Sequence, residues 1–515
     1  MNGAQSLVRT LVDSGVDVCF TNPGTSEMHF VAALDQLPGM RCVLGLFEGA
    51  VTGAADGYYR MAERPAATLL HLGPGLANGL ANLHNAKKAR SGIVNIVGEH
   101  ATYHLAHDAP LTSDVAGVAR PMSDWVHTSA SARDVARDGA RAVQQARTAP
   151  GRIATLILPA DTAWNEADAP ALAPAAPARA AVAGEAITAA AAALRQGGRA
   201  ALLLGGVGVR EGALQLAGRI AARTGCALLS EFNSARMERG AGRVATQRIP
   251  YVVESAQALL QGFTHIVLVG AKPPVGFFAY PGKPSLLAPP GCSFSTLATV
   301  EQDIVGALED LAAALDAQAL APAHVARLDK PALPHGPVTL DGVAQVLGAL
   351  IPPQAIVVDE AISSGRGLGP ATQGAQPHDW LTSMGGSIGY GLPVAVGAAL
   401  ACPQRKVIAL EGDGSAMYTL QALWTMARES LDVTIVVFAN RAYQILRGEF
   451  ANVGAGAPGQ RATDMLTLDR PALDWCALAR GHGVEAGQAA DLEAFARELR
   501  RGLASQGPYL IELLL

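Results

Sequence analysis

The stretch that decides the fold is Lys406-Val-Ile-Ala-Leu-Glu-Gly-Asp413, followed further along by Val436-Val-Phe-Ala-Asn440. Each half is an apolar run of strand length that ends in polar residues. Residues 420–430, between them, have the spacing of an amphipathic helix, so we expect one strand–helix–strand crossover. Asp413 and Asn440 are therefore predicted at the carboxyl ends of parallel strands, the edge where open α/β sheets bind ligands.

Residues at this edge are suited to a magnesium ion that carries a diphosphate. Magnesium prefers octahedral oxygen ligands, commonly a carboxylate, neutral carbonyls and phosphate oxygens. Asp413, the amide oxygen of Asn440 and the main-chain carbonyl of Ala442 would supply three of these ligands. Glycines allow close backbone approach, and the first amides of a helix favour an anion. The diphosphate would lie against Gly412, Gly414 and Ser415.

A Gly-Asp-Gly tripeptide alone also occurs in ordinary turns, and an asparagine at a strand end needs no function. Here the tripeptide ends a strand and opens a helix. Asn440 stands 27 positions after Asp413, which fits one helix and one strand. This order favours a metal site over two unrelated turns.

The order resembles the thiamine-diphosphate motif, in which Gly-Asp-Gly is followed by Asn after one crossover. The resemblance extends over the whole chain to the family of acetolactate synthase large subunits and benzoylformate decarboxylases. It implies a pyrimidine-binding, a central and a diphosphate-binding domain, all of α/β class. It also implies that Asp413, Asn440 and Ala442 hold the magnesium ion and that Tyr443 contacts the coenzyme.

Strand-like runs alternate with Ala/Leu-rich helical segments along the chain, as in α/β folds. We expect three doubly wound domains with central parallel sheets, at residues 1–165, 180–320 and 338–515. Residues 165–179 and 319–337 are rich in Ala and Pro, cannot pack a core, and are predicted linkers. The predicted strands are 16–21, 41–47, 66–72, 93–98, 152–158, 200–205, 227–231, 265–269, 293–297, 355–359, 380–383, 406–411, 433–439 and 509–514.

Composition narrows the class of protein. The chain has 515 residues, of which 50% are hydrophobic and 16% charged, as expected of a large globular protein with several cores. A net charge of −5 gives no basic field for nucleic acid or a membrane surface. The apolar runs are too short to span a membrane, and the first residues do not resemble a signal peptide. The six cysteines have no paired spacing, so we expect free thiols in a cytoplasmic protein.

The segment Glu48-Gly-Ala-Val-Thr-Gly-Ala-Ala-Asp-Gly-Tyr-Tyr59-Arg60 follows an apolar strand and opens a helix of small residues. A lone glutamate at such a place is usually a helix-capping acid. The segment resembles the family's Glu-x-x-Ala-x-x-x-Ala-Asp-Gly-Tyr-Ala-Arg, with Tyr59 in place of the usual Ala. The resemblance implies that Glu48 donates to N1′ of the aminopyrimidine, which prepares the coenzyme to lose its C2 proton.

Two further segments resemble the coenzyme cradle of the family. In Ser383-Met-Gly-Gly386-Ser-Ile388, the resemblance implies that Ile388 wedges under the bent coenzyme and that the Gly386 carbonyl accepts from N4′. Ser363, in a loop after another strand, would contact the diphosphate. Either segment alone is ordinary turn material, but together and in the family's order they favour a coenzyme site.

Substrate-facing residues are implied near the N-terminus. Thr21-Asn-Pro-Gly-Thr25-Ser-Glu27 resembles the benzoylformate-decarboxylase loop whose hydroxyl faces the substrate carboxylate, and Thr25 is the matching position; an N-cap role can coexist with this one. His71 matches a proton-transferring histidine of those decarboxylases, although a lone histidine is more often structural. Acetolactate synthases carry no histidine there. Three more histidines could suggest a metal site, but we expect solvent-facing loop residues: His100, His104 and His107.

Several family features are missing. Residues 271–280 contain no counterpart of the second active-site histidine of benzoylformate decarboxylases, nor the Arg-Phe-Asp-Asp-Arg segment that helps acetolactate synthases hold FAD. Residues 206–212 follow a strand but miss the dinucleotide spacing, so FAD is not supported. The lysine and the C-terminal tryptophan that favour acetolactate formation are not evident.

The resemblance implies a thiamine-diphosphate- and magnesium-dependent decarboxylase or carboligase of 2-oxo acids. After CO₂ leaves, the remaining electron pair is protonated to give an aldehyde, which His71 favours, or joined to an acceptor aldehyde or ketone, which similarity to acetolactate synthases favours. The alternative is a non-catalytic, regulatory paralogue, against which Glu48, Asp413 and Asn440 argue. In this family the two halves of the coenzyme meet across a subunit boundary, which implies at least a homodimer and commonly a homotetramer.

Overall fold

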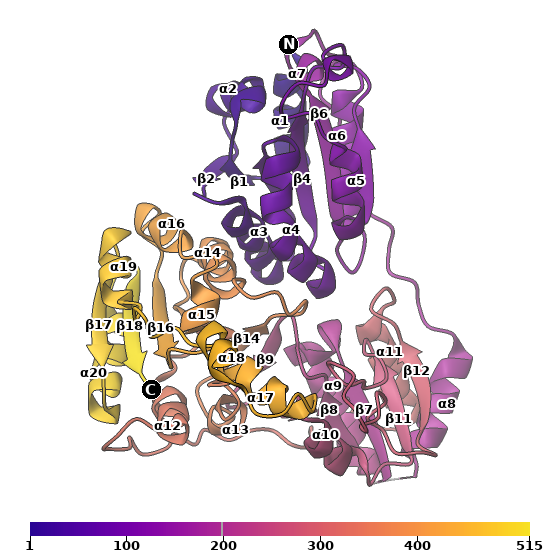
Figure 1. The fold of residues 1–515 in the computed structure, drawn as a ribbon. Coiled ribbons are helices and arrows are strands. Elements are labelled where there is room, and N and C mark those ends of the chain that lie inside the picture. Colours follow the sequence, from indigo (N-terminus) through magenta and orange to yellow (C-terminus); the bar gives the residue numbers. More distant parts are fainter. Residues whose placement is uncertain (197–198) are drawn as a thin grey trace.

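The computed structural model describes residues 1–196 and 199–515, and over these residues the chain forms three α/β units, each on its own sheet (Figure 1). The N-terminal sheet is parallel and has the order β2-β1-β3-β4-β6-β5. Its strands are β1 (Val18–Asn22), β2 (Arg41–Leu44), β3 (Ala66–Leu70), β4 (Ile93–Glu99), β5 (Trp125–Thr128) and β6 (Ile153–Pro159). Its helices are α1 (Gly3–Asp13), α2 (Met28–Gln36), α3 (Glu48–Ala62), α4 (Leu72–Ala89), α5 (Val115–Ala119), α6 (Val135–Arg147) and α7 (Ala160–Trp164).

The central sheet is also parallel, with the order β10-β8-β7-β11-β12. Its strands are β7 (Ala200–Leu204), β8 (Ala227–Ser230), β10 (Gln247–Arg248), β11 (His265–Val269) and β12 (Ser293–Ala298). Its helices are α8 (Gly184–Leu194), α9 (Glu211–Thr224), α10 (Val253–Leu260) and α11 (Ile304–Ala314).

The C-terminal sheet has the order β17-β18-β16-β15-β13-β14-β9. Its last strand, β9 (Met237–Arg239), belongs in sequence to the central unit and pairs antiparallel with β14, beside which Figure 1 draws it. The other strands are β13 (Ile356–Glu360), β14 (His378–Thr382), β15 (Val407–Gly412), β16 (Val433–Ala439), β17 (Glu485–Ala489) and β18 (Tyr509–Leu514). The helices are α12 (Leu340–Leu350), α13 (Leu368–Ala371), α14 (Gly391–Ala401), α15 (Asp413–Ala416), α16 (Ala422–Arg428), α17 (Gln444–Asn452), α18 (Gln460–Met465), α19 (Trp475–Gly481) and α20 (Leu492–Ala504).

The predicted fold class is confirmed, because each sheet has a hydrophobic core on both faces and every predicted strand is present. The prediction of a strand over 41–47 was too long, since residues 45–47 form the bend that leads into α3. Residues 165–183 and 315–339 contain no helix or strand. The exact domain boundaries remain the prediction made from composition. Among the helices of the described residues, none is long and apolar enough to cross a membrane.

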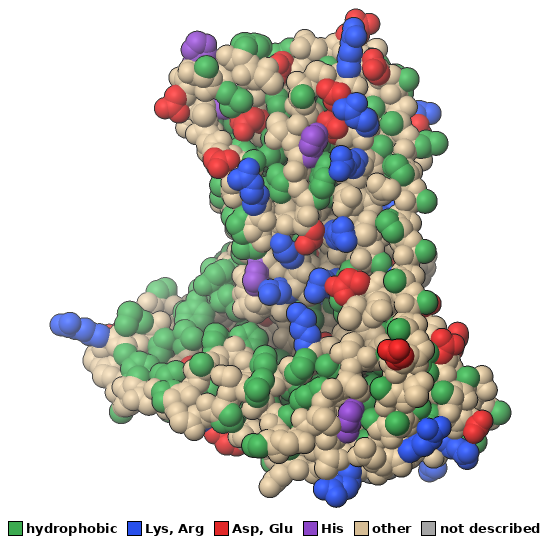
Figure 2. Space-filling model, turned by 90° about the vertical axis from the view of Figure 1, so that its right-hand side faces the viewer, with side chains coloured by type: hydrophobic (Ala, Val, Ile, Leu, Met, Phe, Trp, Pro, Cys, Tyr) green, Lys and Arg blue, Asp and Glu red, His purple; other side chains and the backbone are tan. Residues whose placement is uncertain are grey.

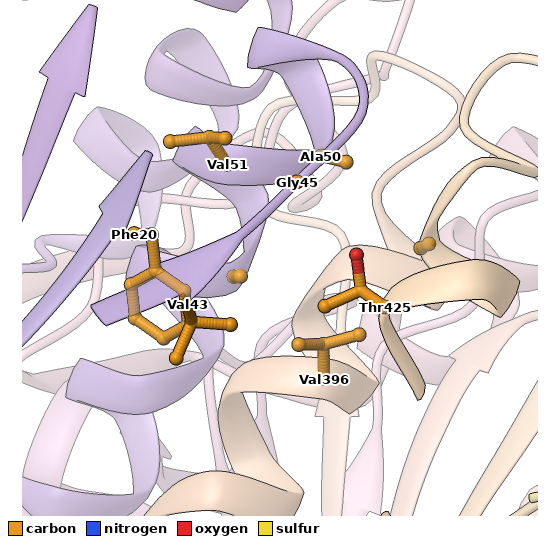
Figure 3. Close-up of a pocket in the computed structure, with 9 residues that line it drawn as sticks. Phe20, Val43, Gly45, Ala50, Val51, Val396 and Thr425 are labelled. Atoms are coloured by element: carbon orange, nitrogen blue, oxygen red, sulfur yellow. The ribbon is translucent and has the colours of Figure 1, made fainter. Parts of the chain in front are cut away.

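The N-terminal and C-terminal units share one core through helices α3 and α14, which approach backbone to backbone. A Cβ atom built on Gly397 would lie 1.9 Å from the carbonyl oxygen of Ala54, and one on Gly57 would lie 2.1 Å from that of Val394. Beside this contact, a void of only about 10 Å³ is lined mainly by apolar side chains of both units, among them Phe20 and Val396 (Figure 3). The helix that begins with Glu48 is thereby fixed against the C-terminal unit.

A buried ion pair adds a polar contact between the same two units. The guanidinium of Arg60 binds both carboxylate oxygens of Asp56, at 2.7 and 2.8 Å, and each side chain is 1% exposed. The third nitrogen of Arg60 donates to the carbonyl of Thr382 at 2.8 Å. Arg60 thus links α3 to the end of β14, directly before the predicted coenzyme segment at 383–388.

Replacing Gly397 by alanine is expected to lower the free energy of unfolding by about 1–3 kcal/mol, because the helices must separate to admit the methyl group. Gly212→Ala is the matched control, since its Cβ would meet nothing within 4 Å and it also lies in a helix, α9. There, alanine is expected to be neutral or to stabilise by up to about 1 kcal/mol. Denaturant unfolding measures both, and equal midpoints for Gly397→Ala and wild type would contradict the packing argument.

Candidate active site

The predicted metal ligands lie on two loops that contact each other. Strands β15 and β16 pair in parallel with Gly412 opposite Phe438, so the residues that follow them leave the same edge of the sheet. The N–H of Arg441 donates to Oδ2 of Asp413 at 2.5 Å. The N–H of Ala442 donates to Oδ1 of Asn440 at 3.0 Å. The crossover predicted from the sequence therefore brings these residues together.

The donor set fits a divalent cation. The side chain of Asp413 is buried, and burial raises the pKa of its carboxyl, which a bound cation would offset. A carbonyl oxygen has two lone pairs, so Oδ1 of Asn440 can accept from Ala442 and still bind a metal. In the described part of the chain, the carbonyls of Arg441 and Tyr443 accept main-chain hydrogen bonds but that of Ala442 does not. No group of three or more His, Cys, Asp or Glu residues that could hold a metal occurs among the described residues.

A cradle of small residues adjoins these ligands. A Cβ atom on Gly414 would lie 2.5 Å from the ring of Tyr443, so the aromatic ring packs directly on the glycine backbone. The hydroxyl of Ser415 donates to the carbonyl of Gly412 at 3.1 Å. Ser363 follows β13, and the 383–388 segment follows β14. Because β16, β15, β13 and β14 are neighbours in the sheet, all the predicted coenzyme loops of the C-terminal unit leave one edge side by side.

Two buried glutamates beneath these loops were not predicted as site residues. Glu360 and Glu411 are opposite each other on β13 and β15. Glu360 accepts the N–H groups of Gly389 at 2.9 Å, Tyr390 at 3.3 Å and Gly391 at 2.9 Å, which fixes the turn after Ile388. Glu411 receives no hydrogen bond from the described residues, and burial, with the charge of Glu360, raises its pKa. The signal in the sequence was an acid inside an otherwise apolar strand.

Glu48 is the first residue of α3 and is buried at the carboxyl end of the N-terminal sheet. The amide Nδ2 of Asn78 donates to its Oε2 at 3.0 Å. Its other oxygen faces Gly75, whose Cβ would lie 3.2 Å away. One carboxyl oxygen is therefore fixed by a hydrogen bond while the other faces a backbone without a side chain. Asn78 was not predicted to take part.

His71 is held by a buried carboxylate that the sequence prediction also missed. Its Nδ1 lies 2.8 Å from Oε2 of Glu27 and 3.2 Å from the hydroxyl of Ser26. Glu27 also accepts the N–H of Gly24 at 2.8 Å and the hydroxyl of Ser26. A carboxylate at Nδ1 favours the tautomer that carries a proton there and leaves Nε2 for chemistry. Thr25, the predicted hydroxyl, is exposed, and Ser26 is the residue that contacts His71.

The loop after β4 contains His100, His104 and His107. Their rings lie next to one another at tilted angles, with centroids 5.5 and 5.7 Å apart, and His104 and His107 are exposed. Their position agrees with the expectation of solvent-facing loop residues for these two histidines. His100 is half-buried.

Helix α4 connects the N-terminal half of the site to the 385–389 segment of the same chain. Asn82 donates to the carbonyls of Gly49 at 2.8 Å and Gly389 at 3.1 Å. Asn85 donates to the carbonyl of Ser387 and accepts its N–H, at 2.9 and 3.1 Å. On the face drawn in Figure 2 the molecule is hollowed between the N-terminal unit above and the lower units, and hydrophobic side chains line the hollow.

Gly386 lies at the boundary with the central unit. Its φ of +76° is a backbone conformation that favours glycine. A Cβ atom there would also lie 2.9 Å from the ring of Phe277. The loop predicted to hold the aminopyrimidine is thus covered on this side by an aromatic residue of the central unit, which is itself 46% exposed.

Comparison with known proteins identifies both coenzyme-binding domains in this chain. Residues 1–117 match the family described as "Thiamine pyrophosphate enzyme, N-terminal TPP binding domain", and residues 369–513 match its "C-terminal TPP binding domain". The chain is 52% identical, over 100% of its length and 99% of the relative, to the "Putative acetolactate synthase large subunit IlvX" of Mycobacterium tuberculosis. It is 33% identical to the benzoylformate decarboxylase of Pseudomonas aeruginosa, over 97% of this chain and 96% of that one.

A solved structure gives the same fold. The 4-hydroxybenzoylformate decarboxylase of Rhodococcus jostii has a TM-score of 0.86 with this chain at 24% identity, covering 99% of this chain and 98% of that one. With both coenzyme-binding domains matched and a relative 52% identical along its full length, the chain belongs to the family of thiamine-diphosphate-dependent enzymes.

Proposed function

We propose that the protein is a thiamine-diphosphate- and magnesium-dependent decarboxylase of 2-oxo acids. The observation that carries this proposal is the Glu27–His71 pair beside Glu48. Glu27 follows β1, His71 follows β3 and Glu48 follows β2. These three strands are neighbours in the N-terminal sheet, so the acid Glu48 and the oriented His71 lie at the same edge of the sheet. A decarboxylase needs both: an acid for the coenzyme and a proton donor for the product. When bound, the coenzyme supplies an electron sink for the pair left by CO₂.

The loops of the C-terminal unit would bind the magnesium ion and the coenzyme. Asp413, Asn440 and the Ala442 carbonyl would hold magnesium, an oxygen set that this ion prefers. The Gly386 carbonyl would accept from N4′ of the aminopyrimidine, and Ile388 would support the bent coenzyme. The diphosphate would lie against Ser363, Gly412, Gly414, Ser415 and Tyr443.

The N-terminal residues would move protons and orient the substrate. Glu48 would donate a proton at N1′, with Asn78 fixing its second oxygen. Nε2 of His71 would supply the proton that the product carbon gains in place of CO₂, so that the product is an aldehyde. Glu27 would stabilise the imidazolium through Nδ1. A hydroxyl of Thr25 or Ser26 would bind the substrate carboxylate.

Carboligation is the second candidate outcome, in which an acceptor aldehyde or ketone replaces the proton. The observation that favours it is Phe277, which covers Gly386 with an apolar ring and offers no proton from the central unit. A relative named as an acetolactate synthase points the same way.

Because the family joins the two coenzyme halves across subunits, we also propose at least a homodimer. A regulatory paralogue is disfavoured, since Glu48, Asp413 and Asn440 are all present.

His71→Ala and Glu27→Gln test the decarboxylase proposal. In both variants, aldehyde release from pyruvate, benzoylformate or glyoxylate is expected to fall by about 10²-fold or more. His71→Ala removes the proton donor for the product carbon, and Glu27→Gln removes the carboxylate that orients this donor. Coenzyme binding should stay unchanged. His104→Ala, at an exposed loop histidine, is the control. Product analysis by NMR decides: unchanged aldehyde release would contradict the role of His71, and acyloin as the sole wild-type product would establish carboligation instead.

A further inference from the structure

A cavity of about 430 Å³ lies between the central and C-terminal units, and of its lining residues only Ser363 has a role in the proposals above. Its volume is in the range of small-molecule pockets. The central unit contributes Tyr251 and Tyr280 with the start of α10. The C-terminal unit contributes Ser363 and Arg366 from the loop after β13, together with one face of α17.

The cavity adjoins the proposed coenzyme site on two sides. Ser363, proposed to contact the diphosphate, lines it, and α17 begins directly after Tyr443. On the other side, the ring of Tyr251 lies 5.5 Å from that of Phe277, which in turn packs against Gly386. A single aromatic ring therefore separates the cavity wall from the loop proposed to hold the aminopyrimidine.

Two cations of the cavity wall lie over tyrosine rings. The guanidinium carbon of Arg366 is 5.8 Å from the ring centroid of Tyr251, and Nζ of Lys283 is 5.2 Å from that of Tyr280. The charge of Lys283 is matched by Glu254 at 2.6 Å. Arg366 is exposed, and within the described residues no carboxylate lies at ion-pair distance from it and its guanidinium makes no hydrogen bond, so its donors face solvent.

The remaining carboxylate of the wall is already engaged. Glu449 accepts the hydroxyl of Tyr251 at 3.2 Å and the side-chain amide of Asn452 at 3.3 Å. The wall therefore contains a neutralised Lys283–Glu254 pair, a hydrogen-bonded Glu449, and one guanidinium whose donors have no partner among the described residues. A guanidinium binds a carboxylate through two parallel hydrogen bonds, and a tyrosine ring beneath it restricts its orientation.

We propose that this cavity binds the side chain of the substrate and that Arg366 recognises a distal carboxylate, so the substrate is a dicarboxylic 2-oxo acid. The proposal rests on the decarboxylase function above. In the reaction the bond between C1 and C2 breaks, C1 leaves as CO₂, and one proton adds to C2. The product is an aldehyde that keeps the distal carboxylate on Arg366. No oxidant or reductant is needed.

The test compares 2-oxoglutarate with 2-oxopentanoate, which has the same chain but ends in a methyl group. For the enzyme loaded with coenzyme and magnesium, kcat/KM from CO₂ release is expected to favour the dicarboxylate by about 10- to 100-fold. Arg366→Gln should abolish this preference through KM for 2-oxoglutarate and leave 2-oxopentanoate unchanged. Arg366→Lys should keep part of it. Arg461→Gln, at an exposed arginine of α18, is the control.

Binding of glutarate and uptake of the coenzyme, both measured by calorimetry, distinguish this inference from the proposed function. Glutarate, which has no 2-oxo group and cannot react, is expected to bind the wild type and to bind Arg366→Gln at least about 10-fold more weakly. This result would support the cavity assignment even if no 2-oxo acid were turned over. Equal kcat/KM for the two acids in an active wild type would overturn the inference alone. Weaker uptake of coenzyme by Arg366→Gln would also overturn it, because Arg366 would then belong to the diphosphate site.

Discussion

Glu48→Gln is expected to lower the turnover of 2-oxo acids by about 10²- to 10⁴-fold, the range that general acid–base catalysis contributes. Glutamine has nearly the size of glutamate and can still accept the hydrogen bond from Asn78 through its amide oxygen. It has no acidic proton to give to N1′ at neutral pH. The loss should therefore appear in kcat, measured as CO₂ release, while calorimetry shows that magnesium-dependent coenzyme uptake is kept.

Glu185→Gln is the matched control for this experiment. Glu185, like Glu48, lies in the first turn of a helix, but it is exposed and belongs to α8 of the central unit. A capping role alone would make the two substitutions equivalent, at a cost of about 0.3–1 kcal/mol in stability and none in turnover. If Glu48→Gln turned over 2-oxo acids as fast as the wild type, the catalytic interpretation would fail and the regulatory one would replace it.

The amino-acid sequence is sufficient to predict the sheets because their central strands are buried on both faces and form continuous apolar runs. Strands β15 and β16 are of this kind, which is why the sequence alone places Asp413 and Asn440 at one edge of a sheet. The strands that were not predicted, β5, β9, β10 and β17, all lie at sheet edges or extend them, and most of their side chains are half-buried or exposed. These strands therefore lack the continuous apolar run from which the other strands are predicted.

The same limit explains what was missed at the candidate site. Glu27 and His71 are 44 residues apart, and Asn78 and Glu48 are 30 apart, so no local spacing indicates these contacts. Glu411 is different, because a carboxylate inside an apolar strand is costly and visible in the sequence. The cavity at Arg366 depends on how the central unit packs against α17, which no motif in either segment specifies.

Asp413→Asn is expected to weaken the magnesium-dependent binding of thiamine diphosphate by at least about 10²-fold, since even residues that only orient metal ligands contribute 10- to 100-fold. Asparagine keeps the shape and one oxygen but removes the charge that neutralises the cation. The coenzyme-free variant should be at least as stable as the wild type, because the substitution removes a buried carboxylate whose pKa is raised by burial. Calorimetry with and without magnesium gives the first result, and thermal unfolding gives the second.

These two results together distinguish a metal ligand from a structural residue. If Asp413 only capped the short helix α15 or bound the N–H of Arg441, its replacement would lower stability and leave coenzyme affinity nearly unchanged. Asp35→Asn, at an exposed position of α2, should alter neither quantity. A stable Asp413→Asn protein that took up the coenzyme as tightly as the wild type would remove the metal from this edge of the sheet. The coenzyme assignments of the neighbouring loops depend on that metal.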